Sequence, residues 1–340
     1  MDSADHHQSA VAQKGGGSFA GIKLLLCENP LPPLAEAVAA AQAELPRSNY
    51  YTEAYSAPLK RLLGQRLGIG EAHIHINAGS ELILRQLFDR YGQQVHLLTP
   101  TYPLFPQIAR RYTETRLPPE RNFDVDLASL EIPRETTLVV VVNPNNPNGG
   151  TFDMRPLPDL LRSHPQTLFL VDEAFIGLAG ESVVPLVPRH PNLLVTRTLS
   201  KAHSLAGFRV GYAVLPESIA AELNGSNDAY PLARASEAAA IATLTHEDRI
   251  LARAAELRAW TEELATELRS LGVRTWPTRT YFFLADFAPH DAGALAVRLR
   301  EQGILVKPLG DPRLGRGVMR VTTALPEENA RVVAALRMLL

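Results

Sequence analysis

The sequence predicts an α/β protein, with a mostly parallel, doubly wound sheet in a large domain and a smaller α+β domain after it. Its 340 residues are too many for one small core and about right for two domains. Up to Leu215, short apolar runs alternate with helical stretches, which is typical of a sheet covered by helices on both faces. After Leu215, a long charged helical stretch and mixed short elements indicate a second domain of different build.

Apolar spacing and turn residues define the elements of the large domain. Pro32 and Pro33 precede an alanine-rich helical stretch, and Gly68 ends an amphipathic one. The run LVVVV at 138–142 is typical of a strand buried on both faces. We expect helices at 31–45, 59–67, 81–90 and 105–112, and strands at 73–76, 95–98, 138–142, 168–171, 193–196 and 210–215.

The smaller domain is predicted around a long helix at 247–271, which has apolar residues at helical spacing and Gly272 after it. Further strands are expected at 281–287, 304–307 and 318–322, and further helices at 292–302 and 327–340. We therefore divide the chain into a flexible tail at 1–20, a large domain at 45–220, and a small domain made of 21–44 with 221–340. The tail is predicted because its histidines and glycines offer little that can pack.

Composition argues against nucleic acid and membrane partners. The formal net charge is −2, so no basic surface for nucleic acid is expected. No apolar run reaches the roughly 20 residues that cross a bilayer, and the run at 22–26 is too short for a signal-peptide core. Cys27 is the only cysteine, which excludes an internal disulfide and favours a reducing compartment. We therefore expect a cytoplasmic protein.

Lys201 lies in the most informative segment of the chain. It follows Thr198 and Ser200, and Arg209 stands eight positions further on. A lysine amine can form an imine with an aldehyde, while hydroxyls and a guanidinium bind a phosphate. The segment therefore suits an aldehyde cofactor that carries a phosphate, as pyridoxal phosphate does.

Four other segments contain candidate site residues, and each also has a plainer explanation. The asparagine-rich stretch at 143–150 is a rigid turn with projecting side chains, or a turn and nothing more. Asp172 is a helix cap, a metal ligand, or the partner of a protonated ring nitrogen. Tyr102 stacks on a flat cofactor or packs in the core. The segment 79–81 begins a predicted helix, where backbone amides bind phosphate or Ser80 caps the helix.

Together these segments resemble the fold-type I aminotransferases that use pyridoxal phosphate. They are most like the histidinol-phosphate aminotransferases and their relative, threonine-phosphate decarboxylase. The resemblance runs from about Cys27-Glu28-Asn29-Pro30 to Arg320-Val321-Thr322-Thr323, with all motifs in the family's order. It implies the pyridoxal-phosphate transferase fold of type I, with the cofactor on the large domain.

The resemblance also implies roles for individual residues. Lys201 would hold the cofactor as a Schiff base and then move the proton, while Asp172 would pair with the pyridine nitrogen. Asn146 would donate to the phenolic oxygen and Tyr102 would stack on the ring. The residues implied to hold the phosphate are Gly79, Ser80, Thr198, Ser200 and Arg209, and Glu81 is implied to be among the cofactor-binding residues. Tyr51, or alternatively Tyr50, would reach the phosphate of the neighbouring subunit, which implies a homodimer with shared active sites.

The substrate side is implied to contain Arg320, Lys307, Asn29 and Tyr281. Arg320 would bind the α-carboxylate as a bidentate pair, although a surface strand arginine is the plainer interpretation. Where histidinol-phosphate enzymes have asparagine and often arginine, this chain has Tyr281 and Asp286. Lys307 replaces an arginine that usually helps to bind the substrate's phosphate. These differences weaken the case for histidinol phosphate as substrate.

Two departures concern the cofactor side. Phe175 lies where many relatives have a tyrosine that hydrogen-bonds the phenolic oxygen. Phenylalanine cannot donate, so we expect a higher pKa for the imine than in tyrosine-bearing relatives. His203 lies where an apolar aromatic residue is common, and either packs or touches the cofactor region.

The sequence thus predicts an aminotransferase that moves an amino group between an amino acid, or a related amine, and a 2-oxo acid by a ping-pong mechanism. The alternative is a lyase on the same site, such as an amino-acid decarboxylase like that of threonine phosphate, or another specialised pyridoxal-phosphate enzyme of amino-acid biosynthesis. A cofactor-binding protein without activity is a third possibility, which the retained Lys201, Asp172 and Arg320 argue against. Pyridoxal phosphate is the expected cofactor, and no metal, nucleic acid or membrane partner is expected.

Overall fold

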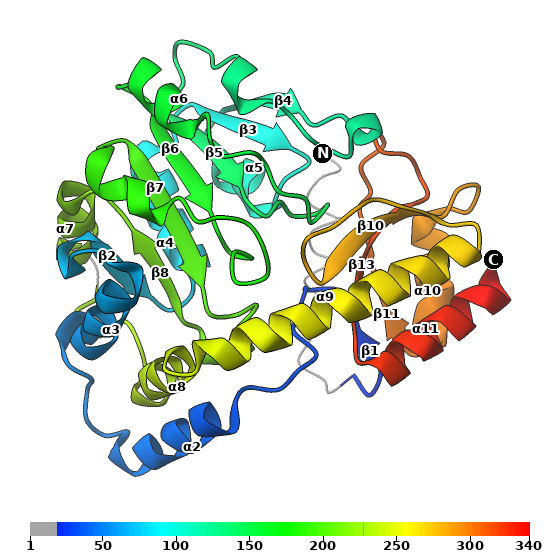
Figure 1. Cartoon of the computed structure of the whole chain (residues 1–340), viewed down its shortest axis with the longest axis horizontal. Coiled ribbons are helices and arrows are strands. Elements are labelled where there is room, and N and C mark those ends of the chain that lie inside the picture. The colour runs from blue at the N-terminus through cyan, green and yellow to red at the C-terminus, as the bar shows by residue number, and fades with distance from the viewer. Residues whose placement is uncertain (1–18, 227) are drawn as a thin grey trace.

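The computed structural model describes residues 19–226 and 228–340 of the chain (Figure 1). Most of the tail predicted at 1–20 lies outside these residues. One large sheet and two small sheets make up the β structure of the described residues. The chain boundaries proposed for the two domains stay a prediction.

The large sheet has seven strands in the order β2-β8-β7-β6-β5-β3-β4. Strands β7, β6, β5, β3 and β4 pair in parallel, whereas β8 runs antiparallel to both of its neighbours. The predicted mostly parallel sheet is therefore confirmed. Its strands are β2 (Ile74–Asn77), β3 (Val95–Thr99), β4 (Tyr112–Arg116), β5 (Leu138–Val142), β6 (Leu168–Asp172), β7 (Leu193–Thr198) and β8 (Gly211–Val214).

Both faces of this sheet are covered, because alternate side chains of its strands enter two separate apolar clusters. Val139 and Val141 pack in one cluster, while Leu138 and Val140 pack in the other. The first cluster is completed by helices α2 (Ala35–Glu44), α3 (Ala57–Leu67), α6 (Leu157–Ser163) and α8 (Arg234–Leu244). The second is completed by α4 (Ser80–Tyr91), α5 (Leu104–Ile108) and α7 (Glu217–Gly225). The sheet is thus doubly wound, as predicted.

The C-terminal part contains a four-stranded antiparallel sheet of order β12-β13-β10-β9 and a parallel pair, β1–β11. Because β1 pairs with β11, residues 22 and 23 lie beside residues 304 and 305. The elements are β1 (Ile22–Lys23), β9 (Arg274–Thr275), β10 (Phe282–Asp286), α10 (Ala292–Glu301), β11 (Ile304–Leu305), β12 (Lys307–Pro308), β13 (Val318–Thr322) and α11 (Pro326–Leu339).

Helix α9 (Glu247–Ser270) joins the two parts, and Figure 1 shows it running from α8 towards β10 and α11. Ile250 and Leu257, near its start, pack with the large sheet. Leu264 and Leu268, near its end, pack with the C-terminal strands and helices. A single helix therefore contributes side chains to both cores.

Most predicted elements are present, but two were wrong. The helix expected at 105–112 ends at Ile108, because Ala109 adopts extended backbone, and the edge strand β4 begins at Tyr112. The strand expected at 304–307 is two strands, since β11 pairs with β1 whereas β12 pairs with β13. Helices α6, α7 and α8 were not predicted.

Candidate active site

The candidate site is built at the carboxyl ends of three neighbouring parallel strands. The turn that carries Asn146 follows β5, Asp172 ends β6, and Thr198 ends β7. Parallel strands present these ends at one edge of a sheet, where ligands of doubly wound folds bind. The sheet order β5-β6-β7 therefore brings together residues that are far apart in the sequence.

Asp172 is a buried carboxylate with hydrogen-bond partners. Thr196, its register partner on β7, donates a 3.0 Å hydrogen bond from Oγ1 to Oδ1. Burial raises the pKa of Asp172 to about 6, and the neighbouring Glu173 acts in the same direction, while the Thr196 hydroxyl, the Ala174 amide and Lys201 oppose it. Above pH 6 the Asp172 carboxylate is ionised, so a positively charged group placed opposite it would be strongly favoured. Sequence reasoning missed Thr196, although it faces the same side of β7 as Thr198.

Hydroxyls, an arginine and a helix start form an anion-binding arrangement. Thr198 Oγ1 donates to Ser200 Oγ at 2.9 Å and accepts from the Ser200 amide at 3.1 Å. The guanidinium of Arg209 lies at the first turn of α4, so close that a methyl group on Gly79 would be 2.5 Å from its Nη2. Gly79 has φ +92° and no side chain caps this helix. The Ser80 end of α4 thus offers uncapped amides beside a cation.

Lys201 is half-buried and its amine is held by the N-terminal segment. Nζ donates to the carbonyl of Leu26 at 2.8 Å and to that of Cys27 at 3.1 Å. It also lies 5.6 Å from the ring centre of Phe175. Burial lowers the pKa of the Lys201 ammonium below its ordinary value, and Arg320 acts in the same direction. A lysine with a lowered pKa more readily provides the neutral amine that attacks an aldehyde.

Arg320, on β13, reaches across to the large sheet. Its Nη1 donates to Oδ1 of Asn146 at 2.8 Å, and its Nη2 donates to the Leu25 carbonyl. Its guanidinium carbon lies 5.6 Å from the ring centre of Phe282. Nε is buried without a hydrogen-bond partner among the described residues. Lys307, on the neighbouring strand β12, is the register partner of Arg320, so two cationic residues stand side by side.

Two residues expected to contact substrate make hydrogen bonds inside the protein. The Asn29 amide nitrogen donates to the carbonyls of Lys201 (3.0 Å) and Ala202 (3.3 Å), and so fixes the lysine-bearing segment. The Tyr281 hydroxyl is buried and donates to the Cys27 carbonyl at 2.6 Å. The carbonyls of residues 24–27, which no sequence signal indicated, are thus acceptors for four side chains of this region.

Tyr102 and Glu81 lie at the edge of the site. Tyr102 packs edge-on against Phe105, with ring centres 5.8 Å apart. Burial raises the pKa of Tyr102 to about 12, with Glu81 and Asp172 acting in the same direction. This electrostatic coupling indicates that Tyr102 lies near Asp172. The Glu81 carboxylate accepts a 2.8 Å hydrogen bond from Arg85, so its side chain is used within α4.

Tyr51, which is predicted to reach the phosphate of a neighbouring subunit, lies on the surface of this chain. Its side chain is 76% exposed and its ring stacks on that of Tyr230, with centres 4.4 Å apart. Tyr50 is exposed too, at 66%. Among the described residues, no hydrogen bond, ion pair or ring contact joins either tyrosine to Lys201 or Asp172.

The two departures from the family pattern have different surroundings. Phe175 is buried and packs edge-on against Phe282, with ring centres 4.9 Å apart. His203 lies beside the start of α9, where its Nε2 is 3.5 Å from a carboxylate oxygen of Glu247. Phe175 thus contacts the Lys201 region, with its ring centre 5.6 Å from Nζ, whereas the imidazole of His203 is next to Glu247.

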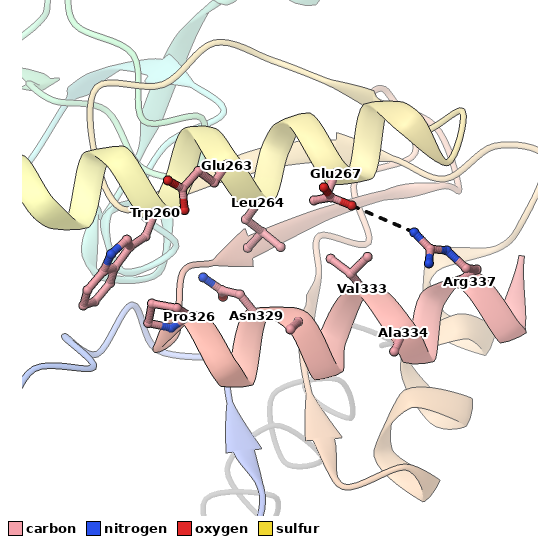
Figure 2. Close-up of a pocket in the computed structure, with 10 residues that line it drawn as sticks. Trp260, Glu263, Leu264, Glu267, Pro326, Asn329, Val333, Ala334 and Arg337 are labelled. Carbon is pink, nitrogen blue, oxygen red and sulfur yellow. Dashed lines mark ion pairs between the residues drawn. The ribbon is translucent and has the colours of Figure 1, made fainter.

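A groove of about 490 Å³ lies apart from these residues, between α9 and α11. Trp260, Leu264 and Val333 line it (Figure 2). A 3.9 Å ion pair between Glu267 and Arg337 crosses it. None of the predicted site residues lines the groove, so its size alone does not make it the catalytic centre.

Comparison with known proteins identifies the family. Residues 23–336 match the model for aminotransferase class I and II. The chain belongs to this family. A histidinol-phosphate aminotransferase of Acinetobacter baumannii (strain SDF) is 31% identical over 328 residues, covering 93% of this chain and 90% of the relative. A second, from Pseudomonas fluorescens (strain Pf0-1), is 32% identical and covers 93% and 92%.

Solved structures share the fold of this aminotransferase. Histidinol-phosphate aminotransferase from Sinorhizobium meliloti in complex with pyridoxal-5'-phosphate gives a TM-score of 0.85 at 23% identity, covering 97% of this chain and 93% of that chain. L-threonine-O-3-phosphate decarboxylase from Porphyromonas gingivalis gives 0.84 at 20%, covering 94% and 99%. The fold is that of the type I pyridoxal-phosphate transferases, and the enzyme is a pyridoxal-phosphate-dependent aminotransferase.

The described residues contain neither a membrane-spanning helix nor a cluster of metal ligands. No helix in the described part of the chain is long and apolar enough to span a membrane. Residues 19–226 and 228–340 contain no group of three or more His, Cys, Asp and Glu side chains arranged to hold a metal ion.

Proposed function

We propose that this aminotransferase takes its amino group from a 2-amino acid whose α-carboxylate binds Arg320, and passes it to a 2-oxo acid. The observation that carries the proposal is the buried guanidinium of Arg320, whose Nε has no hydrogen-bond partner among the described residues. Buried charged donors are costly unless paired, and a carboxylate matches a guanidinium in charge and geometry.

The residues of the site fit the cofactor. Pyridoxal phosphate, when bound, supplies an aldehyde that reacts with amines and a ring that withdraws electrons. Lys201 is the amine we assign to the aldehyde, and its lowered pKa supports this role. Asp172 would hold the proton on the ring nitrogen. Thr198, Ser200, Arg209 and the uncapped start of α4 would hold the phosphate.

The protein's own residues would then direct the chemistry. Arg320 orients the amino acid by binding the substrate's carboxylate. The hydrogen bond from Arg320 to Asn146 connects this binding residue to the turn after β5. The Asn146 amide nitrogen remains to donate to the phenolic oxygen. Lys201, as a neutral amine, is the base that takes the proton from the substrate's Cα. The carbonyls of Leu26 and Cys27 can hold this amine while it is not covalently engaged.

A phosphorylated donor is a second candidate. The relatives named above are histidinol-phosphate aminotransferases, and Lys307 stands beside Arg320 as a further cation. A lysine binds phosphate as a point charge rather than as a fork, so this candidate ranks second. We also propose a cytoplasmic homodimer with shared sites, which the exposure of Tyr51 supports.

The test is a panel of single amino donors added to the purified, cofactor-loaded protein, read by the absorbance of the bound cofactor. We expect 2-amino acids to convert it to the amine form and a 2-oxo acid to restore it. Conversion by histidinol phosphate alone would overturn the assignment of Arg320 to an α-carboxylate. Release of carbon dioxide without conversion would replace the aminotransferase by a decarboxylase.

A further inference from the structure

A buried charge network lies directly behind Asp172. The next residue, Glu173, is 1% exposed. Its Oε2 accepts hydrogen bonds from Arg197 Nε at 2.8 Å and from Ser182 Oγ at 2.9 Å, and its Oε1 accepts from the Val183 amide at 2.7 Å. Both oxygens of Glu173 are thus satisfied, and Arg197 is the cation in direct contact with it.

The alternation of side chains along a strand explains this placement. Asp172 and Thr196 are register partners, and their side chains meet on the cofactor side of the sheet. The following residues, Glu173 and Arg197, point to the opposite side, because successive side chains on a strand face opposite ways. There Arg197 also donates to the hydroxyl of Tyr212, its register partner on β8.

Two adjacent carboxylates in a buried place repel each other. Glu173 raises the pKa of Asp172, in addition to the effect of burial. Without Arg197, Glu173 would keep the hydrogen bonds from Ser182 and the Val183 amide, which favour its ionised form. Its uncompensated charge would then raise the pKa of Asp172 further.

We propose that Arg197 is a positioning residue for the reaction, which keeps Asp172 ionised on the cofactor side by neutralising Glu173 on the opposite side. This inference rests on the proposed role of Asp172 as partner of the ring nitrogen. It makes the Glu173–Arg197 pair part of the catalytic electrostatics rather than a support of the fold alone.

Other charges near this pair are already engaged. A cavity of about 310 Å³ behind the sheet is lined by Glu173, Arg197, His203, Glu247 and Arg66. Glu247 lies 3.5 Å from His203 and 3.6 Å from Arg66. Against the effect of burial, His203 and the charges of Arg66 and Arg197 lower the pKa of Glu247, so this cluster is electrostatically coupled to the pair. On the cofactor side, Lys201 favours the ionised form of Asp172. Tyr102 lies nearby as well, but as an uncharged phenol, because burial holds its pKa at about 12.

The test compares Arg197→Met, Arg197→Lys, Glu173→Gln and the double variant Glu173→Gln/Arg197→Met. For each, the acid limb of kcat/KM is measured, together with the pH dependence of Tm for the cofactor-free protein. Arg197→Met is expected to move both transitions up by about one pH unit. Arg197→Lys keeps the charge and should leave them near the wild-type pH. In the double variant, which lacks both charges, the two transitions should also lie near their wild-type pH.

A merely structural role gives a different result. If Arg197→Met lowers Tm but leaves both transitions at the wild-type pH, the inference is wrong. If that variant does not fold, Glu173→Gln decides, since it should move both transitions to lower pH, and unmoved transitions would again overturn the proposal. Asp172→Asn separates this inference from the proposed function, because an acid limb that persists in Asp172→Asn contradicts the role of Asp172 itself.

Discussion

Arg320 Nη1 and Asn146 Oδ1 are joined by a 2.8 Å hydrogen bond, although the residues lie 174 positions apart. The bond connects a strand of the C-terminal sheet with the turn that follows β5 in the large sheet. A ligand that binds Arg320 therefore acts on the turn that carries Asn146. In the proposed function, this contact would link substrate binding at Arg320 to cofactor binding at Asn146.

Replacing Arg320 tests its proposed grip on the α-carboxylate. Arg320→Ala should lower kcat/KM for the best amino donor by about 100-fold, because a charge-assisted pair in a buried site is lost. Arg320→Lys should recover only part of the lost kcat/KM, since an ammonium cannot form the bidentate pair that a guanidinium makes with a carboxylate. Arg316→Ala, an exposed arginine of the same region, is the matched control and should stay near wild type. A change below twofold in Arg320→Ala would contradict the assignment.

Gly79 leaves room for Arg209 at the start of α4. In Gly79→Ala the new methyl group would lie 2.5 Å from Arg209 Nη2, at a backbone φ of +92° that alanine disfavours. The arginine must move, so we expect affinity for pyridoxal phosphate to fall by about tenfold or more. Equilibrium titration of cofactor-free protein measures this. Gly225→Ala, where nothing lies within 4 Å of the added carbon, is the control. Equal affinities in the two variants would contradict a phosphate site at Arg209 and the start of α4.

Asp172 should make the cofactor-free protein less stable as pH rises. Its folded-state pKa of about 6 lies above the ordinary 3.8, so the folded state binds the extra proton between these values. Stability from this group is present at low pH and is lost as pH rises through about 4 to 6, by about 3 kcal/mol in total. Asp172→Asn should remove that slope and be the more stable protein at pH 8. Denaturant titrations across this range measure the effect, and parallel pH profiles would rule it out.

Phe175→Tyr tests the missing hydroxyl. The ring lies 5.6 Å from Lys201 Nζ and is edge-on to Phe282, so a hydroxyl added to it would lie near the cofactor region. Hydrogen bonding to the deprotonated form should lower the pH at which the bound cofactor's absorbance changes by about one unit. A spectroscopic pH titration of both proteins is the measurement. Coincident titration curves would show that the hydroxyl does not reach its target.

Mixing inactive variants tests whether sites are shared between subunits. Lys201→Ala and Tyr51→Ala should each be poorly active alone. In a randomly mixed homodimer about half the molecules are hybrids with one intact site, so activity should return to about a quarter of wild type. Tyr112→Ala mixed with Lys201→Ala is the control, because Tyr112 is exposed on β4, and that variant should be active before mixing. No recovery in the Tyr51 mixture would place Tyr51 outside the neighbour's site.

The sequence sufficed for the central strands but not for the periphery. The run of valines at 138–142 coincides with β5, because a strand buried on both faces must be apolar throughout. Strand β4 lies at the edge of the sheet, and its polar sequence YTETR carries no such pattern. Whether 304–307 forms one strand or two depends on partners almost 300 residues earlier and a dozen later, which no local pattern reveals.

The same distinction holds for the site. Residues at strand ends, such as Asp172 and Thr198, could be proposed from position alone, since parallel strands present their carboxyl ends together. The contacts of Lys201 with the carbonyls of Leu26 and Cys27 could not, because backbone carbonyls have no sequence signature. The Glu173–Arg197 pair was missed because its partners became neighbours only through the register of β6 and β7.

The contacts of residues 24 and 25 with β13 have a consequence for the order in which the protein is made. The carbonyls of Leu24 and Leu25 accept hydrogen bonds from Thr322 and Arg320, which are translated 298 and 295 residues later. Domains generally fold as units during synthesis, from the N-terminal end. Here residues 24 and 25 have to wait for nearly 300 further residues, so the pocket around Lys201 can close only after β13 has been translated.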